Sequence, residues 1–440
     1  MAHSESKKKG RDLRAQVPRS RHADWTPPPR RRDPLEILRS QETSRIPSLL
    51  PIRHERMAVS PFTFFRGAAA IMAEDLAHTP ACGLRVQACG DAHLLNFGIY
   101  ATPERRVVFD VTDFDETLQA PFEWDVKRLA TSLVVAGRDR EFTPAECTGA
   151  AQGAVTAYRT RMAALAQMGH LDVWYARLDA DEFVTLAQRA ADRKLATNVL
   201  RKAQHATNLG ALEKLTKIVA GSRRIVDSPP LIEHVPDPGE GVDAAAVVGQ
   251  YEDSLGDTTR LLLARYRAVD WARKVVGVGS VGTDDAIVLL LGDSDSDPLF
   301  LQVKEASESV LEPFAGASPY DNHGQRVVAG QHLIQSASDL FLGWTRLGHH
   351  DYYVRQLRDM KGSIPVDKLS AEELAQYGRA CGEALALGHA RSGDPAAVAG
   401  YLGSGARFDK AVAAFAGAYA DQNAADYAAF RAAFGPASSS

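Results

Sequence analysis

Apolar residues recur along the chain with two different periods, which separate helical from strand-rich segments. Short apolar runs bounded by turn residues predict strands, which lie at 84–89, 97–100, 106–109, within 273–304 and at 352–357. Apolar residues at helical spacing predict helices, which lie at 60–76, 121–137, 143–220, 244–270, 325–342 and around 408–419. The pattern therefore predicts an α+β fold.

Two of the predicted helices begin with a recognisable cap. Ser60 precedes Pro61, and Ser370 is followed three residues later by Glu373. A serine side chain can accept a hydrogen bond from a free N–H group of the first turn, where proline is also tolerated. Serine followed at this spacing by glutamate is typical of a capping box.

The same pattern divides the chain into four segments. Residues 226–243 are rich in proline, glycine and aspartate and read as a connection. The predicted segments are a basic arm at 1–44, a mostly helical segment at 45–267, a β-rich segment at 268–362 and C-terminal helices at 363–435.

Charge is unevenly distributed between the arm and the body. The chain has 51 Lys and Arg against 55 Asp and Glu, a net charge of −4, yet residues 1–40 hold eleven basic and five acidic residues. Nucleic-acid-binding domains are usually basic in their folded part. We therefore interpret the arm as a disordered, solvated tail rather than as a nucleic-acid- or phosphate-binding segment. Deleting residues 1–40 is predicted to leave thermal stability nearly unchanged.

Cysteine use and hydropathy point to a cytoplasmic protein without a membrane partner. The four cysteines, Cys82, Cys89, Cys147 and Cys381, form no C-x-x-C pair. A disulfide framework or a cysteine zinc site is therefore not expected. No apolar run reaches the roughly 18 residues that a membrane span needs, and the N-terminus has no apolar signal region.

The clearest chemical motif is Gly90-Asp91-Ala92-His93-Leu94-Leu95-Asn96, followed by a predicted strand hairpin and Asp113-Phe114-Asp115. It resembles the catalytic loop of aminoglycoside phosphotransferases and choline kinases, H-G-D-x-H-x-x-N, with Cys89 in place of the first histidine. The resemblance implies ATP and Mg²⁺ as cofactors, a catalytic Asp91 with His93, and metal ligation by Asn96 and Asp113. Asp110 and Asp115 remain alternative metal ligands, and a simple Gly-Asp turn is the plain structural alternative.

The resemblance to these kinases continues downstream of the acidic cluster, which consists of Asp110, Asp113, Asp115 and Glu116. They follow it with P-x-x-x-D-L-A, and this chain has Pro121-Phe122-Glu123-Trp124-Asp125. The resemblance implies that Asp125 begins a helix and hydrogen-bonds the catalytic loop. A negative charge near a helix N-terminus would also be favourable without any such role.

A second motif has the character of a phosphate-binding loop. Gly277, Gly279, Ser280 and Gly282 lie between two predicted strands, and Lys304 ends a third. Glycines let the backbone approach the phosphates of ATP, and a strand lysine can pair with them. A dinucleotide-binding fold would require a helix directly after the glycines, where strand-forming residues stand instead.

The order of the two motifs is reversed relative to protein kinases. The glycine loop comes about 185 residues after Asp91, so we infer a circularly permuted arrangement, which nearby chain termini make tolerable. A kinase lysine also needs a helical glutamate as its partner. No candidate is well placed; those weighed are Glu305, Glu308, Glu312, Gln331 and Asp339.

Two histidine motifs rank lower. His389-Ala390-Arg391-Ser392-Gly393-Asp394 lacks an asparagine five residues after the aspartate, and it also reads as the end of a helix. His349-His350-Asp351 reads as surface, because adjacent residues rarely converge on one metal ion.

Over roughly residues 20–435 the chain resembles the bacterial family catalogued as domain of unknown function 2252. The resemblance rests on Phe64-Phe65-Arg66-Gly67, Gly90-Asp91-Ala92-His93, Asp113-Phe114-Asp115-Glu116-Thr117, Gln302-Val303-Lys304 and Tyr353-Val354-Arg355. It implies no activity by itself.

These motifs predict a two-lobed, protein-kinase-like and circularly permuted fold, with a large helical lobe and a small β-rich lobe. The predicted function is ATP- and Mg²⁺-dependent phosphotransfer to an unidentified hydroxyl of a small molecule or protein. Two alternatives remain: a non-catalytic nucleotide-binding module, and a metal-dependent phosphohydrolase that uses Asp91, His93 and the acidic cluster.

Overall fold

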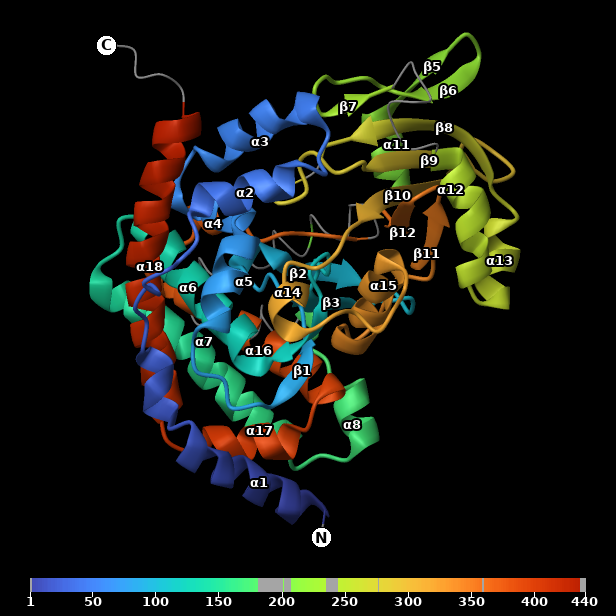
Figure 1. Ribbon diagram of the computed structural model, residues 1–440. Coiled ribbons are helices and arrows are strands. Elements are labelled where there is room, and N and C mark those ends of the chain that lie inside the picture. Colours follow the sequence, from blue (N-terminus) through green and yellow to red (C-terminus); the bar gives the residue numbers. More distant parts are fainter. Residues whose placement is uncertain are drawn as a thin grey trace.

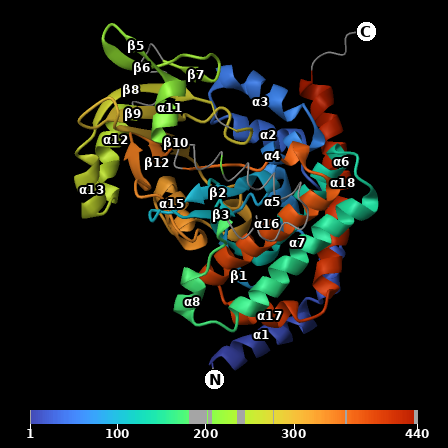
Figure 2. The same ribbon diagram turned by 180° about the vertical axis from the view of Figure 1, so that it is seen from behind.

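The computed structural model describes residues 2–180, 201, 207–234, 244–275, 277–357 and 360–435. A helical part and a six-stranded sheet lie at different ends of the molecule, as Figures 1 and 2 show. The predicted α+β class is confirmed. Parts of the segments predicted at 143–220 and 226–243 lie outside the described residues.

The helical part is built on four long helices, α6 (Phe122–Asp139), α7 (Pro144–Leu165), α16 (Ala371–Ser392) and α18 (Arg407–Phe434). Shorter helices surround them: α1 (Ala2–Gln16), α2 (Pro34–Glu42), α3 (Leu50–Met57), α4 (Pro61–Gly67), α5 (Ala69–Ala77), α8 (His170–Tyr175) and α17 (Pro395–Leu402). Ser60 and Ser370 cap their helices as expected, and both form capping boxes, with Thr63 and Glu373 as partners. In the described ranges, no helix combines the length and apolarity that a membrane crossing requires.

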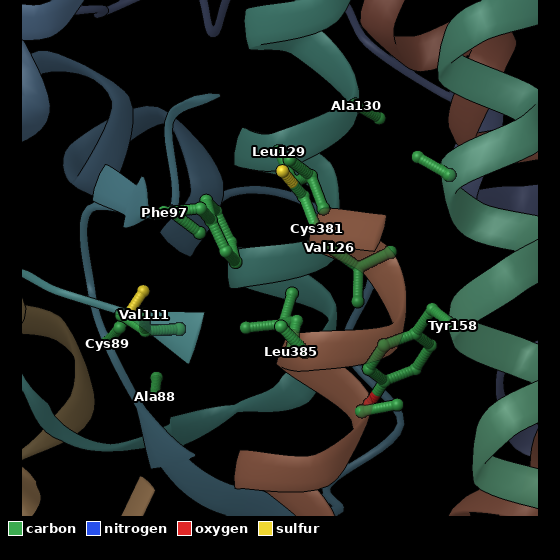
Figure 3. Close-up of a cluster of buried hydrophobic side chains, with 14 of the residues drawn as sticks. Ala88, Cys89, Phe97, Val111, Val126, Leu129, Ala130, Tyr158, Cys381 and Leu385 are labelled. Carbon is green, nitrogen blue, oxygen red and sulfur yellow. The ribbon is translucent and has the colours of Figure 1, made fainter. Parts of the chain in front are cut away.

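Two small strand pairs are anchored on the helical core. β1 (Arg85–Ala88) pairs antiparallel with β4 (Leu118–Pro121), and β2 (Phe97–Ala101) pairs antiparallel with β3 (Val107–Val111). Side chains from β1, β2 and β3 and from Cys89 are buried together with residues of α6, α7 and α16, as Figure 3 shows. This packing holds both ends of the Asp91 loop against a buried apolar cluster of the helical part.

The large sheet has the strand order β11-β12-β10-β9-β8-β7, and every neighbouring pair is antiparallel. Its strands are β7 (Ile232–Glu233), β8 (Arg267–Lys274), β9 (Ala286–Leu291), β10 (Pro298–Ala306), β11 (Gly343–Leu347) and β12 (His350–Gln356). Both faces are covered. Alternate residues of β9 enter two separate apolar clusters, one containing α12 (Ala244–Tyr251) and the other α11 (Asn208–Leu215).

Most of the remaining elements lie near this sheet, whereas α14 (Glu312–Ala315) contacts β4 and α5. The others are the hairpin β5 (Thr216–Val219) and β6 (Ser222–Ile225), and the helices α13 (Asp257–Leu263) and α15 (His323–Ile334). The sheet part thus begins near residue 208 rather than at the predicted 268, because α11, β7 and α12 bury their apolar residues against the sheet.

Two predicted helices are shorter than expected. The one at 244–270 ends at Tyr251, a turn and α13 follow, and β8 begins at Arg267. The one at 325–342 ends at Ile334, where Gln335 takes an extended conformation. Serine, aspartate and glycine after each end favour turns over continued helix.

The N-terminal arm is ordered, contrary to the prediction of a disordered tail. α1 packs against α17, where Gly10 and Gly400 let the two backbones approach closely. Its basic residues serve as hydrogen-bond donors. Arg14 Nε donates to Tyr401 O at 2.9 Å and Arg19 donates to Leu402 O at 2.5 Å. These carbonyls end α17 and lack helical partners, so arginines can satisfy them.

A second contact binds the arm more firmly. Arg31 donates to both carboxylate oxygens of Asp75, on α5, at 2.8 and 2.7 Å. It also donates to both oxygens of Asp426, on α18, at 2.9 and 2.6 Å. Both aspartates are buried. Hydrophobic periodicity could not reveal an arm that is held by charged hydrogen bonds.

Candidate functional site

The Asp91 loop begins with a glycine that the structure requires. Gly90 follows β1 with φ of +82°, and a Cβ atom there would lie 2.3 Å from the carbonyl oxygen of Glu116. An L-residue would meet both an unfavourable conformation and a backbone clash. The close approach brings the loop against the acidic segment that follows β3.

Replacing Gly90 by alanine should therefore destabilise the fold more than an ordinary glycine substitution. Gly83 is a matched control, because its φ is +84° but nothing lies within 4 Å of its Cβ position. We expect Gly90→Ala to lower the free energy of unfolding by about 1–3 kcal/mol more than Gly83→Ala does, through the added overlap. Urea unfolding of both variants measures this, and equal losses would contradict the close approach.

Asp125 supports the loop from the first turn of α6. Its carboxylate accepts hydrogen bonds from the backbone N–H groups of Cys89 at 2.7 Å and Gly90 at 3.0 Å. The hydrogen bond that the kinase resemblance implied for Asp125 is therefore present. His389 Nε2 lies 3.2 Å from the same carboxylate, so the lower-ranked histidine motif contributes a buried support.

Asp91 is held by an arginine and faces a neutral histidine. Arg128 Nε donates to Asp91 Oδ1 at 2.6 Å, while Asp91 Oδ2 lies 3.7 Å from His93 Nε2. Burial raises the pKa of Asp91, and the charge of Arg128 opposes that rise. Burial, followed by the charges of Arg66 and Arg128, lowers the pKa of His93 well below its usual value. Asn96 Nδ2 donates to the carbonyl of Asp91 at 2.8 Å and fixes the loop.

The three aspartates of the acidic cluster lie in three different environments. Asp110 accepts a hydrogen bond from Ser336 N at 2.9 Å and lies buried away from the cleft described below. Asp115 is bound by Lys304 and by the hydroxyl of Tyr353, both at 2.5 Å. Asp113 accepts only the N–H of Asp115, at 3.3 Å, among the described residues. Burial and the charge of Asp115 raise the pKa of Asp113. Of these three aspartates, Asp113 is thus the one that retains a carboxylate oxygen without a partner among the described residues.

Lys304 finds its partner in this cluster and not on a helix. Burial alone would lower the pKa of Lys304, but the charge of Asp115 raises it well above its usual value, so the ammonium stays charged. The partners considered from sequence have other contacts: Glu305 binds His350, Glu312 binds Ser309 and Ser318, and Asp339 binds Phe341 and Gln356. Gln331 binds Gln335, and Glu308 makes no contact with Lys304 among the described residues. The expected helical position was therefore wrong.

The glycine loop rests on two arginines of α3 and on Arg45, which lies in the turn after α2. Arg56 donates to Gly277 O at 2.5 Å, and Arg53 donates to Val278 O at 3.1 Å and Gly279 O at 2.8 Å. Arg45 donates to Val281 O at 2.6 Å, and its side chain lies against Gly282. These contacts occupy carbonyl groups of the loop. Within the described part of the chain, the N–H groups of Val278, Gly279 and Val281 have no acceptor.

Both motifs line one cleft with a volume of about 730 Å³. Of the residues predicted from sequence, the cleft is lined by Asp91, His93, Asn96, Asp113, Gly277, Gly279 and Ser280. Lys304 reaches the site through its contact with Asp115, which also lines the cleft, whereas Gly282 faces Arg45. Across the described ranges, no group of three or more His, Cys, Asp or Glu side chains is arranged to hold a metal ion by itself.

Sequence reasoning missed the arginines and the tyrosine of this site. Arg66 lines the cleft, Arg128 binds Asp91, and Tyr353 binds Asp115. Arg66 and Tyr353 stand in motifs that indicated only the family, so a local signal existed without a role. His350 of the other histidine motif is largely exposed, as expected, but Asp351 is buried and binds Asn322 and Arg346.

Comparison with known proteins places the chain in one family. The chain matches no curated protein and no solved structure. Residues 45–433 match the profile described as an uncharacterized protein conserved in bacteria, DUF2252. The match spans most of the chain and includes the Asp91 loop, the acidic cluster, the glycine loop and Lys304, so the protein belongs to the DUF2252 family.

Proposed function

We propose that this protein is an ATP- and Mg²⁺-dependent phosphotransferase with a circularly permuted, protein-kinase-like architecture, acting on a hydroxyl acceptor. The observation that carries the proposal is the meeting of two distant motifs. The loop at Gly277–Ser280 and the loop at Asp91–Asn96 line one cleft. A phosphotransferase needs a phosphate-binding loop opposite a base and its metal ligands.

The order of elements in the sheet supports the same proposal. The glycine loop joins β8 to β9, Lys304 lies on the next strand, β10, and α15 follows. Protein kinases place the glycine-rich loop, the strand lysine and the following helix in this order. Here the whole set follows the Asp91 loop in the chain, which is why we propose a permutation.

Asn96 and Asp113 fit a magnesium ion. Asp113 keeps a carboxylate oxygen without a partner among the described residues, and Asn96 uses its amide nitrogen for Asp91 O, which leaves its amide oxygen. The backbone N–H of Thr112, the residue before Asp113, donates to the backbone carbonyl of Asn96 at 2.8 Å. This bond ties the two ligand residues together. Mg²⁺ prefers hard oxygen ligands. The ion would supply positive charge to the phosphates.

Asp91 would act as the base. Its Oδ2 takes the proton of the acceptor hydroxyl as the acceptor oxygen forms a bond to the terminal phosphorus of ATP. The bond from that phosphorus to the bridging oxygen breaks, and ADP leaves with the electron pair. Arg128 keeps Asp91 Oδ1 occupied and orients the free oxygen. Lys304, kept charged by Asp115, would pair with the phosphates.

Isothermal titration with ATP and Mg²⁺ tests the nucleotide site. We expect Asp113→Asn to weaken Mg²⁺-dependent binding, because an amide is a poorer ligand for a hard cation. Lys304→Ala should weaken ATP binding about 10- to 100-fold, since a charge-assisted hydrogen bond contributes about 1.5–3 kcal/mol. The exposed residues Asp293 and Lys368 provide matched controls, Asp293→Asn and Lys368→Ala, which should bind as wild type does.

The outcome also separates the alternatives. A phosphohydrolase that uses Asp91, His93 and the acidic cluster would lose nothing when Lys304 is replaced. A non-catalytic module would bind ATP but show no turnover with any hydroxyl acceptor. If wild-type protein binds no ATP with Mg²⁺, both the phosphotransferase and the nucleotide-module proposals fail.

A further inference from the structure

The side chain of Arg66 places a positive charge in the cleft. Arg66 lies near the end of α4 and lines the cleft. Throughout the described ranges, its side chain has no hydrogen-bond or ion-pair partner, and its Nε is buried. Other arginines of the cleft are engaged: Arg53 binds three backbone carbonyls, Arg45 binds Val281 O, and Arg32 lies 3.6 Å from Glu74. Arg66 is half-buried, and a buried donor such as its Nε is costly unless a ligand supplies an acceptor.

The backbone around Arg66 is bonded to both halves of the site. Phe65 O accepts from Arg128, the arginine that binds Asp91, at 3.0 Å. Gly67 O accepts from Arg53, the arginine that binds the glycine loop, at 2.9 Å. The carbonyl of Arg66 also lies 3.6 Å from the Cβ position of Gly279. Arg66 is therefore fixed between the proposed base and the proposed phosphate-binding loop.

Its electrostatic surroundings agree with this position. Asp91 and Asp113 are the carboxylates whose charges act most strongly on Arg66, after burial. A group that passes from nucleotide to acceptor must move between these two aspartates under the proposed mechanism. Guanidinium matches the oxygens of a phosphate in a bidentate manner and is more weakly hydrated than an ammonium.

We propose that Arg66 binds the terminal phosphoryl group of the nucleotide and stabilises its charge during transfer. This inference rests on the proposed function, because it requires a nucleotide in the cleft. It adds a residue for which the kinase resemblance implied no role. The opposing explanation is that Arg66 only balances the charges of Asp91 and Asp113.

Binding of ADP and of a non-hydrolysable β,γ-imido ATP analogue, each with Mg²⁺, tests the proposal without an acceptor. Wild type should bind the analogue more tightly than ADP. Arg66→Ala should lose about 10- to 100-fold in analogue affinity while its ADP affinity stays within about twofold. Arg66→Lys should fall between the two, because it keeps the charge and loses the bidentate geometry. Arg30→Ala, at an exposed arginine that does not line the cleft, is the control and should change neither affinity.

Each result decides a different question. If Arg66→Ala and Arg66→Lys lose ADP and analogue affinity equally, or lose neither, Arg66 does not contact the terminal phosphoryl group and the inference is overturned. Because the side chain of Arg66 makes no hydrogen bond to the described residues, both variants should melt close to wild type. If wild type binds neither nucleotide, the proposed function fails and this inference fails with it.

Discussion

Asp91→Asn is expected to reduce phosphoryl transfer about 10²- to 10⁴-fold while ATP affinity in the presence of Mg²⁺ stays unchanged. Losing a positioned general base typically costs this much. The amide keeps an oxygen for Arg128 Nε, so the loop should retain its shape. What is lost is the ability of the side chain to take the acceptor's proton.

Turnover is measured as ADP formation with a panel of hydroxyl compounds, and affinity by titration. Asp293→Asn, an exposed aspartate on the β9–β10 loop, is the matched control and should keep full turnover. A variant that loses ATP affinity in proportion to turnover would place Asp91 in nucleotide binding and not in proton transfer.

The same carboxylate should shape the pH dependence. Burial raises the pKa of Asp91, against the opposing charge of Arg128. The base form is present above its pKa, so transfer should increase as the pH rises through that value. The acid limb of the rate profile should therefore lie above the ordinary aspartate pKa of about 3.9. A limb at or below that value would point to a different group.

Arg31→Ala is expected to lower the free energy of unfolding by about 3–5 kcal/mol. This is the usual cost of removing one partner from a buried charge cluster. The side chain of Arg31 is 12% exposed, and the carboxylates of Asp75 and Asp426 are 3% and 6% exposed. Without the guanidinium, two buried negative charges would face each other.

Arg30→Ala is the matched control, because Arg30 is the exposed neighbour of Arg31. Surface substitutions of this kind usually change stability by about 0.5 kcal/mol or less. Urea unfolding of both variants gives the difference. Equal stability of the two would show that the arm is not bound through Arg31.

Local sequence was informative wherever a structure depends on close neighbours. The caps at Ser60 and Ser370 involve residues three positions apart, and the strands around the Asp91 loop follow from short apolar runs. Helix ends were less predictable. The helix expected at 244–270 ends at Tyr251, and Arg267 begins β8, whose place is set by its pairing with the distant strand β9.

Sequence alone determined the α+β class, the family and the residue types of the candidate site, because periodicity, capping and motif spacing act over a few residues. The tertiary structure decided which distant groups meet. Asp115 lies 189 residues from Lys304, and Arg31 lies 395 residues from Asp426. A charged side chain on a helix or strand carries no local mark of its partner, since the partner depends on how the elements pack. For the same reason only the folded chain brings Arg66 between the Asp91 loop and the glycine loop.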